Sequence, residues 1–213
     1  MGYEYDVFIS YTRGFPFGNW VKDTFYPFFK SYLENSLSYQ PNIFIDKNDI
    51  SPGDSWPDKI KSALINSKCL VSIWSPAYFR SPWCMKECGI MHFREQELEY
   101  RTIKKPYGLI LPVNILDGKR FPEFAKNIHW LDFRKHARVG EGFKNTKRYV
   151  YIQDKLEEWI EKDVAEIIEK SPPWDKQWRT NEWISKAVKY SKTIDAKDDK
   201  TQLTGLEEKW DKS

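Results

Sequence analysis

The sequence of 213 residues has few cysteines and no long apolar stretch. Three cysteines, a small and odd number, argue against a disulfide framework and fit a reducing compartment. The longest apolar run, 108–116, is far shorter than the roughly 20 residues that a membrane-spanning helix needs. Glu4 and Asp6 stand where a signal peptide would carry a basic segment followed by an apolar one, so we expect no signal peptide and a cytoplasmic location.

The sequence also gives little indication that the protein binds a metal or nucleic acid. Cys84, Cys88 and His92 follow one another every four residues, a spacing at which two side chains of one helix can share a metal. No further cluster of cysteine and histidine completes such a site, so we expect no metal and interpret Cys88 as a small core residue. A formal net charge of +3 is too small to indicate binding to nucleic acid, and no membrane partner is expected.

What the sequence does contain is an alternation of strand and helix patterns, with enough apolar residues (40%) for a core. We predict strands at 5–10, 43–45, 69–74, 107–113 and 128–133. We predict helices at 17–37, 56–66, 82–101 and 149–170, the first of them kinked by Pro27. This alternation predicts an α/β fold of the flavodoxin-like class, with a five-stranded, mainly parallel sheet covered by helices on both faces.

The composition changes at Ser171-Pro172-Pro173, which breaks the last long helix. We therefore divide the chain into a domain at 1–170 and a tryptophan-rich C-terminal extension at 171–213. A short amphipathic helix around Trp183 is expected in the extension. It either folds back on the domain or docks a partner or another copy of the chain.

The most informative segment is Ser81-Pro82-Trp83-Cys84-Met85-Lys86-Glu87, which follows a buried strand. Serine is a favoured residue at a helix N-cap, and proline suits the first helical position. On the helix that starts here, Trp83, Cys84 and Glu87 share one face because they are three or four residues apart. A carboxylate beside an aromatic ring at the edge of a sheet predicts a ligand site.

Three segments together resemble the TIR (Toll/interleukin-1 receptor) domain family: 5–11, 46–53 and 81–87. The resemblance extends over about residues 1–170 and is nearest to bacterial TIR proteins that cleave NAD+, such as the stand-alone proteins of Thoeris-like anti-phage systems. It implies the TIR variant of the flavodoxin-like fold. It also implies an NAD+ nucleosidase with NAD+ as substrate rather than cofactor.

The resemblance implies a role for each residue at a matching position. Glu87 matches the catalytic glutamate, which lies near the nicotinamide ribose. A single carboxylate suffices there, because nicotinamide leaves as a neutral group from a positively charged sugar. The expected substrate-binding residues are Ser10, Tyr11, Arg13, Phe15, Trp56, Trp83 and Cys84. Among them, Arg13 is the natural partner of the diphosphate, and Cys84 is not interpreted as a nucleophile.

The loop after the second strand matches a family loop that mediates assembly and gates the site. Its expected residues here are Asp49, Ser51, Pro52, Gly53 and Asp54. The resemblance therefore implies a homo-oligomer or another TIR–TIR assembly when the protein is active. It also implies a possible downstream effector that reads the nucleotide product.

Three functions remain open from the sequence. Cleavage of NAD+ would yield nicotinamide with ADP-ribose or a cyclic ADP-ribose variant as a signal, as expected for bacterial anti-phage immunity. A non-catalytic TIR adaptor acting by TIR–TIR contacts is the alternative, although Glu87 with Trp83 and Cys84 favours the enzyme. Another nucleotide hydrolase or base-exchange enzyme using the same carboxylate is the third.

Overall fold

The computed structural model describes residues 2–45, 58–119 and 121–194. One parallel sheet has the strand order β2-β1-β3-β4-β5. Its strands are β1 (Tyr5–Ser10), β2 (Ile43–Ile45), β3 (Ser67–Trp74), β4 (Ile110–Asn114) and β5 (Leu131–Asp132). This order is that of the flavodoxin-like folds, which confirms the predicted fold class.

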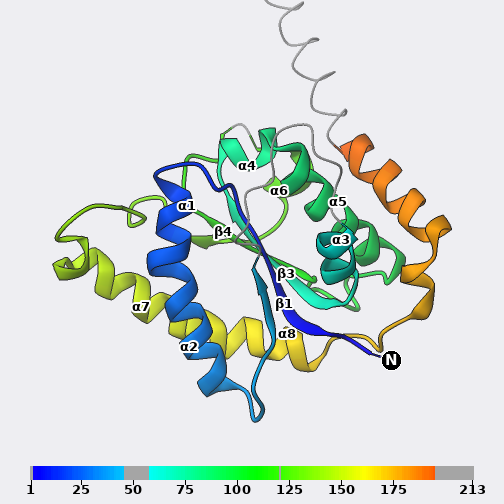
Figure 1. Cartoon of the computed structure of the whole chain (residues 1–213), viewed down its shortest axis with the longest axis horizontal. Helices are drawn as coiled ribbons and strands as arrows, with labels where there is room; N and C mark the ends of the chain where they lie inside the picture. Colours follow the sequence, from blue (N-terminus) through cyan, green and yellow to red (C-terminus); the bar gives the residue numbers. More distant parts are fainter. Residues whose placement is uncertain (1, 46–57, 120, 195–213) are drawn as a thin grey trace, which may run out of the picture.

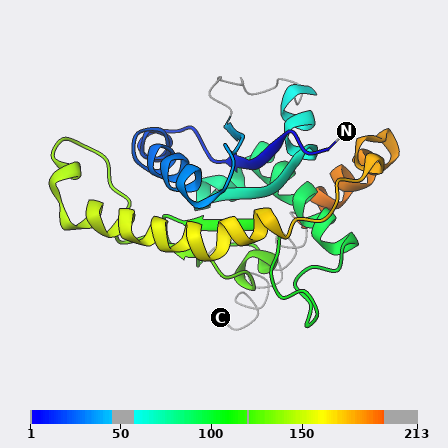
Figure 2. The same cartoon turned by 90° about the horizontal axis from the view of Figure 1, so that it is seen from below.

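Helices form a layer on each face of the sheet (Figures 1 and 2). One face is covered by α1 (Phe17–Trp20), η1 (Val21–Phe25), α2 (Tyr26–Ser36), α7 (Lys147–Trp159), η3 (Ile160–Val164) and α8 (Ala165–Glu169). The other is covered by α3 (Asp58–Ile65), α4 (Pro76–Arg80), α5 (Pro82–Glu97) and α6 (Glu123–Lys126). Two short 3-10 turns are η2 (Phe143–Asn145) and η4 (Lys176–Arg179).

Alternation along the strands divides the apolar side chains between two cores. Val7 and Ile9 of β1 face the layer of α1, α2, α7 and α8, whereas Phe8 faces the layer of α3 and α5. The two-residue period of a strand explains this division. None of the helices in the described ranges combines the length and apolar character needed to cross a bilayer.

The helical segment expected at 17–37 is present over 17–36, and its regular α-helical hydrogen bonding is interrupted next to Pro27. A π-helical turn, η1, stands directly before it, and the amide of Tyr26 donates to the carbonyl of Val21 five residues back. Pro27 thereby falls in the first turn of α2, where a missing N–H group costs little.

Helix α5 ends at Glu97, four residues earlier than expected, because the chain turns sharply behind it. Glu99 and Arg101 adopt left-handed backbone conformations, with φ of 55° and 60°. The turn lets Arg101 donate to both carboxylate oxygens of Glu95, at 2.9 and 3.0 Å. This bidentate ion pair offsets the backbone strain, which costs on the order of 1–3 kcal/mol per residue.

The same pair replaces a strand partner at the edge of β4 that β5 leaves unpaired. Strand β5 pairs only with the end of β4, at Val113 and Asn114. At Ile110 the amide donates to Glu95 Oε1 at 2.7 Å, and the carbonyl accepts from Arg101 at 2.8 Å. Short pairing therefore leaves β5 with two residues instead of the six expected at 128–133, while the backbone groups of Ile110 remain hydrogen-bonded.

The described part of the C-terminal extension, 171–194, folds back on the domain and contains a helix over 181–194 (Figure 1). Trp178, Trp183 and Ala187 belong to the core formed with α3 and α5. The His92 ring of α5 is hydrogen-bonded to Tyr190 at 2.8 Å. The extension is therefore part of the packed domain over these residues.

Gly89 of α5 sets the distance between α5 and the extension helix. A Cβ atom at this position would lie 2.3 Å from the Cβ and 2.7 Å from the Cα of Ser191, which is closer than atoms can approach. We expect Gly89→Ala to lower the free energy of unfolding by about 1–2 kcal/mol, because the cost of forcing the helices apart exceeds the gain in helix propensity. Urea denaturation measures this change.

Gly2→Ala is the matched control, since a Cβ at Gly2 meets nothing within 4 Å. Equal stability of Gly89→Ala and the wild type would show that the extension helix is not held against α5.

Candidate active site

Two serines start the helices that build the site. Ser75 accepts a hydrogen bond from the Tyr78 amide at 3.1 Å and begins α4, while Ser81 accepts from the Cys84 amide at 3.4 Å and begins α5. Each serine is followed by a proline in the first helical turn. The N-cap and proline pattern of the sequence thus fixes where α5 starts, as predicted.

Glu87 lies in the second turn of α5 and points into the protein beneath the C-terminal end of β1. Its side chain is largely buried, at 8% exposure. One carboxylate oxygen, Oε2, accepts a hydrogen bond from Ser10 Oγ at 2.6 Å. The hydroxyl of Tyr78 lies 3.0 Å from the same Ser10 oxygen. A buried carboxylate held in this way has a defined orientation.

A cavity of about 200 Å³ opens at this carboxylate, beyond the C-terminal ends of the strands. Its lining residues come from the segment after β1 and from the start of α5: Tyr11, Thr12, Arg13, Ser81, Trp83, Cys84 and Glu87. The structure therefore brings together five of the candidate site residues and adds Thr12 and Ser81. Lys86 extends over the ring of Trp83, with its Nζ 5.0 Å from the ring centroid.

The thiol of Cys84 is protonated in this environment. Burial raises the pKa of Cys84 to about 12, and the negative charge of Glu87 acts in the same direction. The positive charge of Arg13 opposes this effect without cancelling it. Nucleophilic chemistry requires the thiolate, so the surroundings of Cys84 disfavour a nucleophilic role.

Other candidate residues lie elsewhere. Ser10 stands behind Glu87 and not on the cavity wall. Phe15 is 82% exposed and lines a different cavity, with residues 138–145, so its expected contact with a base is not supported by its position. Trp56 and the loop residues Asp49, Ser51, Pro52, Gly53 and Asp54 lie outside the described residues.

Tyr78 was not identified from the sequence. It stands in the short segment Pro76–Arg80, where a tyrosine has no distinguishing spacing to Ser10 or Glu87. Only the fold brings α4, β1 and α5 together at this point. Full burial raises the pKa of Tyr78 well above its usual value, so this phenol remains a hydrogen-bond donor.

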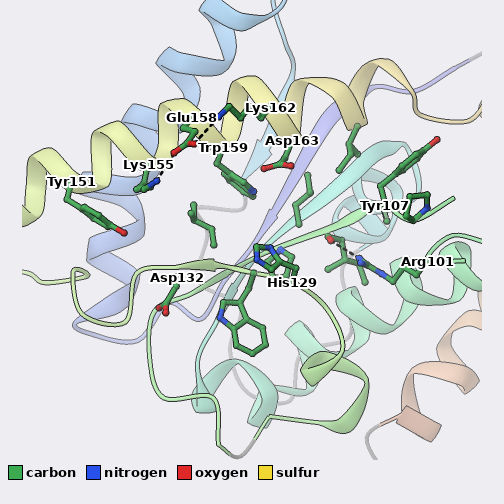
Figure 3. A pocket seen from close by; sticks show the side chains of 18 residues that line it. Arg101, Tyr107, His129, Asp132, Tyr151, Lys155, Glu158, Trp159, Lys162 and Asp163 are labelled. Atoms are coloured by element: carbon green, nitrogen blue, oxygen red, sulfur yellow. Dashed lines mark hydrogen bonds and ion pairs between the residues drawn. The ribbon is translucent and has the colours of Figure 1, made fainter. Parts of the chain in front are cut away.

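A larger cavity of about 490 Å³ lies at the edge of the sheet, between the first half of β4 and helices α7 and α8 (Figure 3). Its charged groups largely neutralise one another. Glu158 accepts from Lys155 at 2.6 Å and from Lys162 at 2.9 Å, and Arg101 is held by Glu95. The smaller cavity is the better candidate for chemistry, because it lies at the carboxyl edge of a parallel sheet and contains the buried carboxylate.

Metal binding finds no support in the described ranges, where no group of three or more histidine, cysteine, aspartate or glutamate side chains is arranged to hold an ion.

Two curated plant proteins are similar in sequence. Disease resistance protein RPS6 of Arabidopsis thaliana is 26% identical over 211 residues, which cover 97% of this chain and 16% of that protein. The probable 2' cyclic ADP-D-ribose synthase BdTIR of Brachypodium distachyon is 30% identical over 77 residues, or 36% of this chain and 34% of that protein. The matches thus span about a third or less of the length of these relatives.

Two solved structures are also similar. The TIR domain of the Toll-related receptor TRR-2 from Hydra magnipapillata is 20% identical, with a TM-score of 0.42 over 71% of this chain and 98% of that chain. The TIR domains of the activated Roq1 resistosome, which directly recognises the pathogen effector XopQ, are 18% identical. Their TM-score is 0.37, over 87% of this chain and 96% of that chain.

A family model for the TIR domain matches residues 7–147, well over half of the chain. The matched region contains the sheet from Val7 of β1 onward, the buried Glu87 and every residue that lines its cavity. The chain therefore belongs to the TIR domain family.

Proposed function

We propose that this TIR domain cleaves the bond between nicotinamide and ribose in NAD+. The observation that carries the proposal is Glu87, a carboxylate buried at 8% exposure, held by Ser10 and facing a cavity that Arg13 and Trp83 also line. The name of BdTIR, a probable 2' cyclic ADP-D-ribose synthase, supports the same chemistry in a relative.

The size of the cavity fits part of the substrate. At about 200 Å³ it is smaller than the ~300–1,000 Å³ of typical drug-sized sites, so it accommodates a ring and a sugar rather than a whole dinucleotide. The ring of Trp83 offers a stacking surface for nicotinamide. The guanidinium of Arg13, at the cavity wall, offers paired donors to the diphosphate.

Glu87 stabilises the reacting sugar. As the nicotinamide–ribose bond breaks, its electron pair leaves with nicotinamide, and positive charge develops on the ribose. A carboxylate fixed in a poorly hydrated site stabilises that charge more effectively than it would in water. Attack by water on the sugar, with loss of a proton to solvent, gives ADP-ribose. Attack by the adenine of the same molecule gives a cyclic product.

The biological setting is part of the proposal. RPS6 is named as a disease resistance protein, which supports a signalling role in immunity. We propose that the chain acts in the cytoplasm, that it is active as a TIR–TIR assembly, and that a downstream effector reads its product. A role against phage is the form of immunity that the sequence resemblance favours.

The experiment that tests the proposal is measurement of NAD+ loss and product mass with purified protein at high concentration. We expect release of nicotinamide by the wild type, with the mass of the second product distinguishing hydrolysis by water from intramolecular cyclisation. Intact NAD+ under conditions that assemble the domains would favour the non-catalytic adaptor instead.

Glu87→Gln is expected to reduce turnover by at least about 100-fold, because the variant keeps an acceptor for Ser10 but loses the charge that stabilises the sugar. Circular dichroism should show an unchanged fold. Glu169→Gln, which alters an exposed glutamate at the end of α8, is the matched control and should be fully active. Turnover by Glu87→Gln equal to the wild type would remove Glu87 from catalysis.

Arg13→Ala is expected to raise KM roughly tenfold with a much smaller change in kcat, because a contact to the diphosphate binds ground state and transition state alike. Steady-state kinetics with NAD+ measure both constants. Arg134→Ala is the control, since Arg134 is bound to Asp132 on the surface, at 2.7 Å. An unaltered KM would place the diphosphate elsewhere.

Cys84→Ser is expected to retain activity within about threefold, because a thiol with a pKa of about 12 is protonated at neutral pH and supplies no nucleophile. The native protein should also resist iodoacetamide at pH 8 and react after denaturation. A covalent adduct between substrate and Cys84, detected by mass spectrometry, would contradict this assignment.

A further inference from the structure

Three buried oxygen atoms from three different elements form a chain behind the cavity. Tyr78 of α4 is fully buried, and its hydroxyl lies 3.0 Å from Ser10 Oγ at the end of β1. Ser10 Oγ in turn lies 2.6 Å from Oε2 of Glu87 on α5. The two hydrogen bonds connect residues 68 and 77 positions apart in the sequence, so only the folded chain creates them.

The direction of both hydrogen bonds follows from the number of protons available. An ionised carboxylate accepts only, so Ser10 must give its single proton to Glu87. The Ser10 oxygen then has only lone pairs left for its second neighbour, and the Tyr78 hydroxyl must donate to it. Each donation polarises the next bond, which strengthens the chain in a buried environment.

We infer that Tyr78 is a positioning residue which, through Ser10, orients the carboxylate of Glu87 and keeps it ionised. The inference rests on the proposed function, since it assigns Tyr78 a part in that reaction. Burial favours the neutral form of a carboxyl group, and hydrogen bonds donated to the charged form oppose this effect. Removing the phenolic hydroxyl should weaken the Ser10 bond and let Glu87 take up a proton more readily.

Three described neighbours of Glu87 do not change their own protonation between pH 4 and 8. The thiols of Cys84 and Cys88 and the phenol of Tyr78 all have pKa values raised by burial, so they remain neutral. None of these described neighbours is therefore expected to titrate between pH 4 and 8, so a change in that range that is specific to the Glu87 resonance reports on its carboxyl.

The test compares Tyr78→Phe, Ser10→Ala and the double variant with the wild type. Phenylalanine keeps the ring that packs in the core and removes only the hydroxyl. We expect Tyr78→Phe to lower kcat about three- to tenfold at pH 7 with little change in KM, and to move the acid limb of the kcat profile to higher pH. We expect Ser10→Ala to have a larger effect, with partial rescue in Ser10→Thr.

The double variant separates action through Ser10 from a direct effect. If Tyr78 acts through Ser10, adding Tyr78→Phe to Ser10→Ala changes kcat no further. Independent, multiplying losses would overturn the inference. Ser72→Ala is one matched control, because Ser72 is buried beside Ser10 on β3 and its hydroxyl has no partner among the described residues. Tyr100→Phe, a buried tyrosine remote from the cavity, is the other.

A second measurement does not depend on turnover. The side-chain carboxyl of Glu87 can be titrated by carbon-13 NMR in the wild type and in Tyr78→Phe, and the inference requires a midpoint at higher pH in the variant. Replacing Tyr78 with 3-fluorotyrosine, a stronger hydrogen-bond donor, should move the midpoint to lower pH. This replacement provides the test if Tyr78→Phe does not fold. Equal midpoints would overturn the inference, whereas shifted midpoints in a protein that does not consume NAD+ would contradict only the proposed function.

Discussion

The position of α5 depends on two adjacent buried charges near its end. Arg94 is fully buried, and its guanidinium donates to the carbonyls of Ser67 and Ile65 at 2.9 and 2.8 Å. Glu95, equally buried, accepts from the amides of Leu109 and Ile110. Removing such charges from water costs several kcal/mol each, which the hydrogen bonds must offset. These hydrogen bonds form only at one position of α5 along its own axis relative to β3 and β4. The two charges therefore fix the position of the helix against the sheet.

This position determines where the site is. The N-terminal end of α5 is set by the Ser81 cap, and its C-terminal end by Arg94 and Glu95. Between these two ends lies Glu87, whose carboxylate accepts a hydrogen bond from Ser10 Oγ at 2.6 Å. A catalytic carboxylate must be held in place before the charge on the substrate develops. The two buried charges at one end of α5 therefore support the chemistry proposed at the other.

The sequence predicts local features well and long-range ones poorly. The strand over 5–10 and the start of the helix at Pro82 depend on apolar alternation and on a serine–proline cap, which are local signals. The same signals predict the fold class and place Glu87, Trp83 and Cys84 on one face of a helix. The strand expected at 128–133 was too long, because pairing at β5 depends on where Glu95 and Arg101 reach β4.

Residues that act through a partner distant in the sequence were missed for the same reason. The sequence around Tyr78 does not indicate its contact with Ser10. The sequence around Arg94 likewise does not indicate its hydrogen bonds to the carbonyls of Ser67 and Ile65. Phe15 is an example of the opposite kind. Its place shortly after the first strand suggested a contact with a base of the substrate, but its side chain is exposed and lines a different cavity. Spacing along the chain reports on one helix or strand, whereas these contacts depend on how several elements pack together.

The extension adds a constraint from outside the matched family region. The family match ends at residue 147. The helix over 181–194 nevertheless packs against α5, and Ser191 approaches α5 closely at Gly89, which has no side chain. Arg94 also stacks on Trp178, with its guanidinium carbon 4.1 Å from the ring centroid. The pKa of Lys86, beside Glu87, is lowered by burial and then by the charge of Lys192 in the extension. The described part of the extension therefore helps to set the position of α5 and adds positive charge close to Lys86.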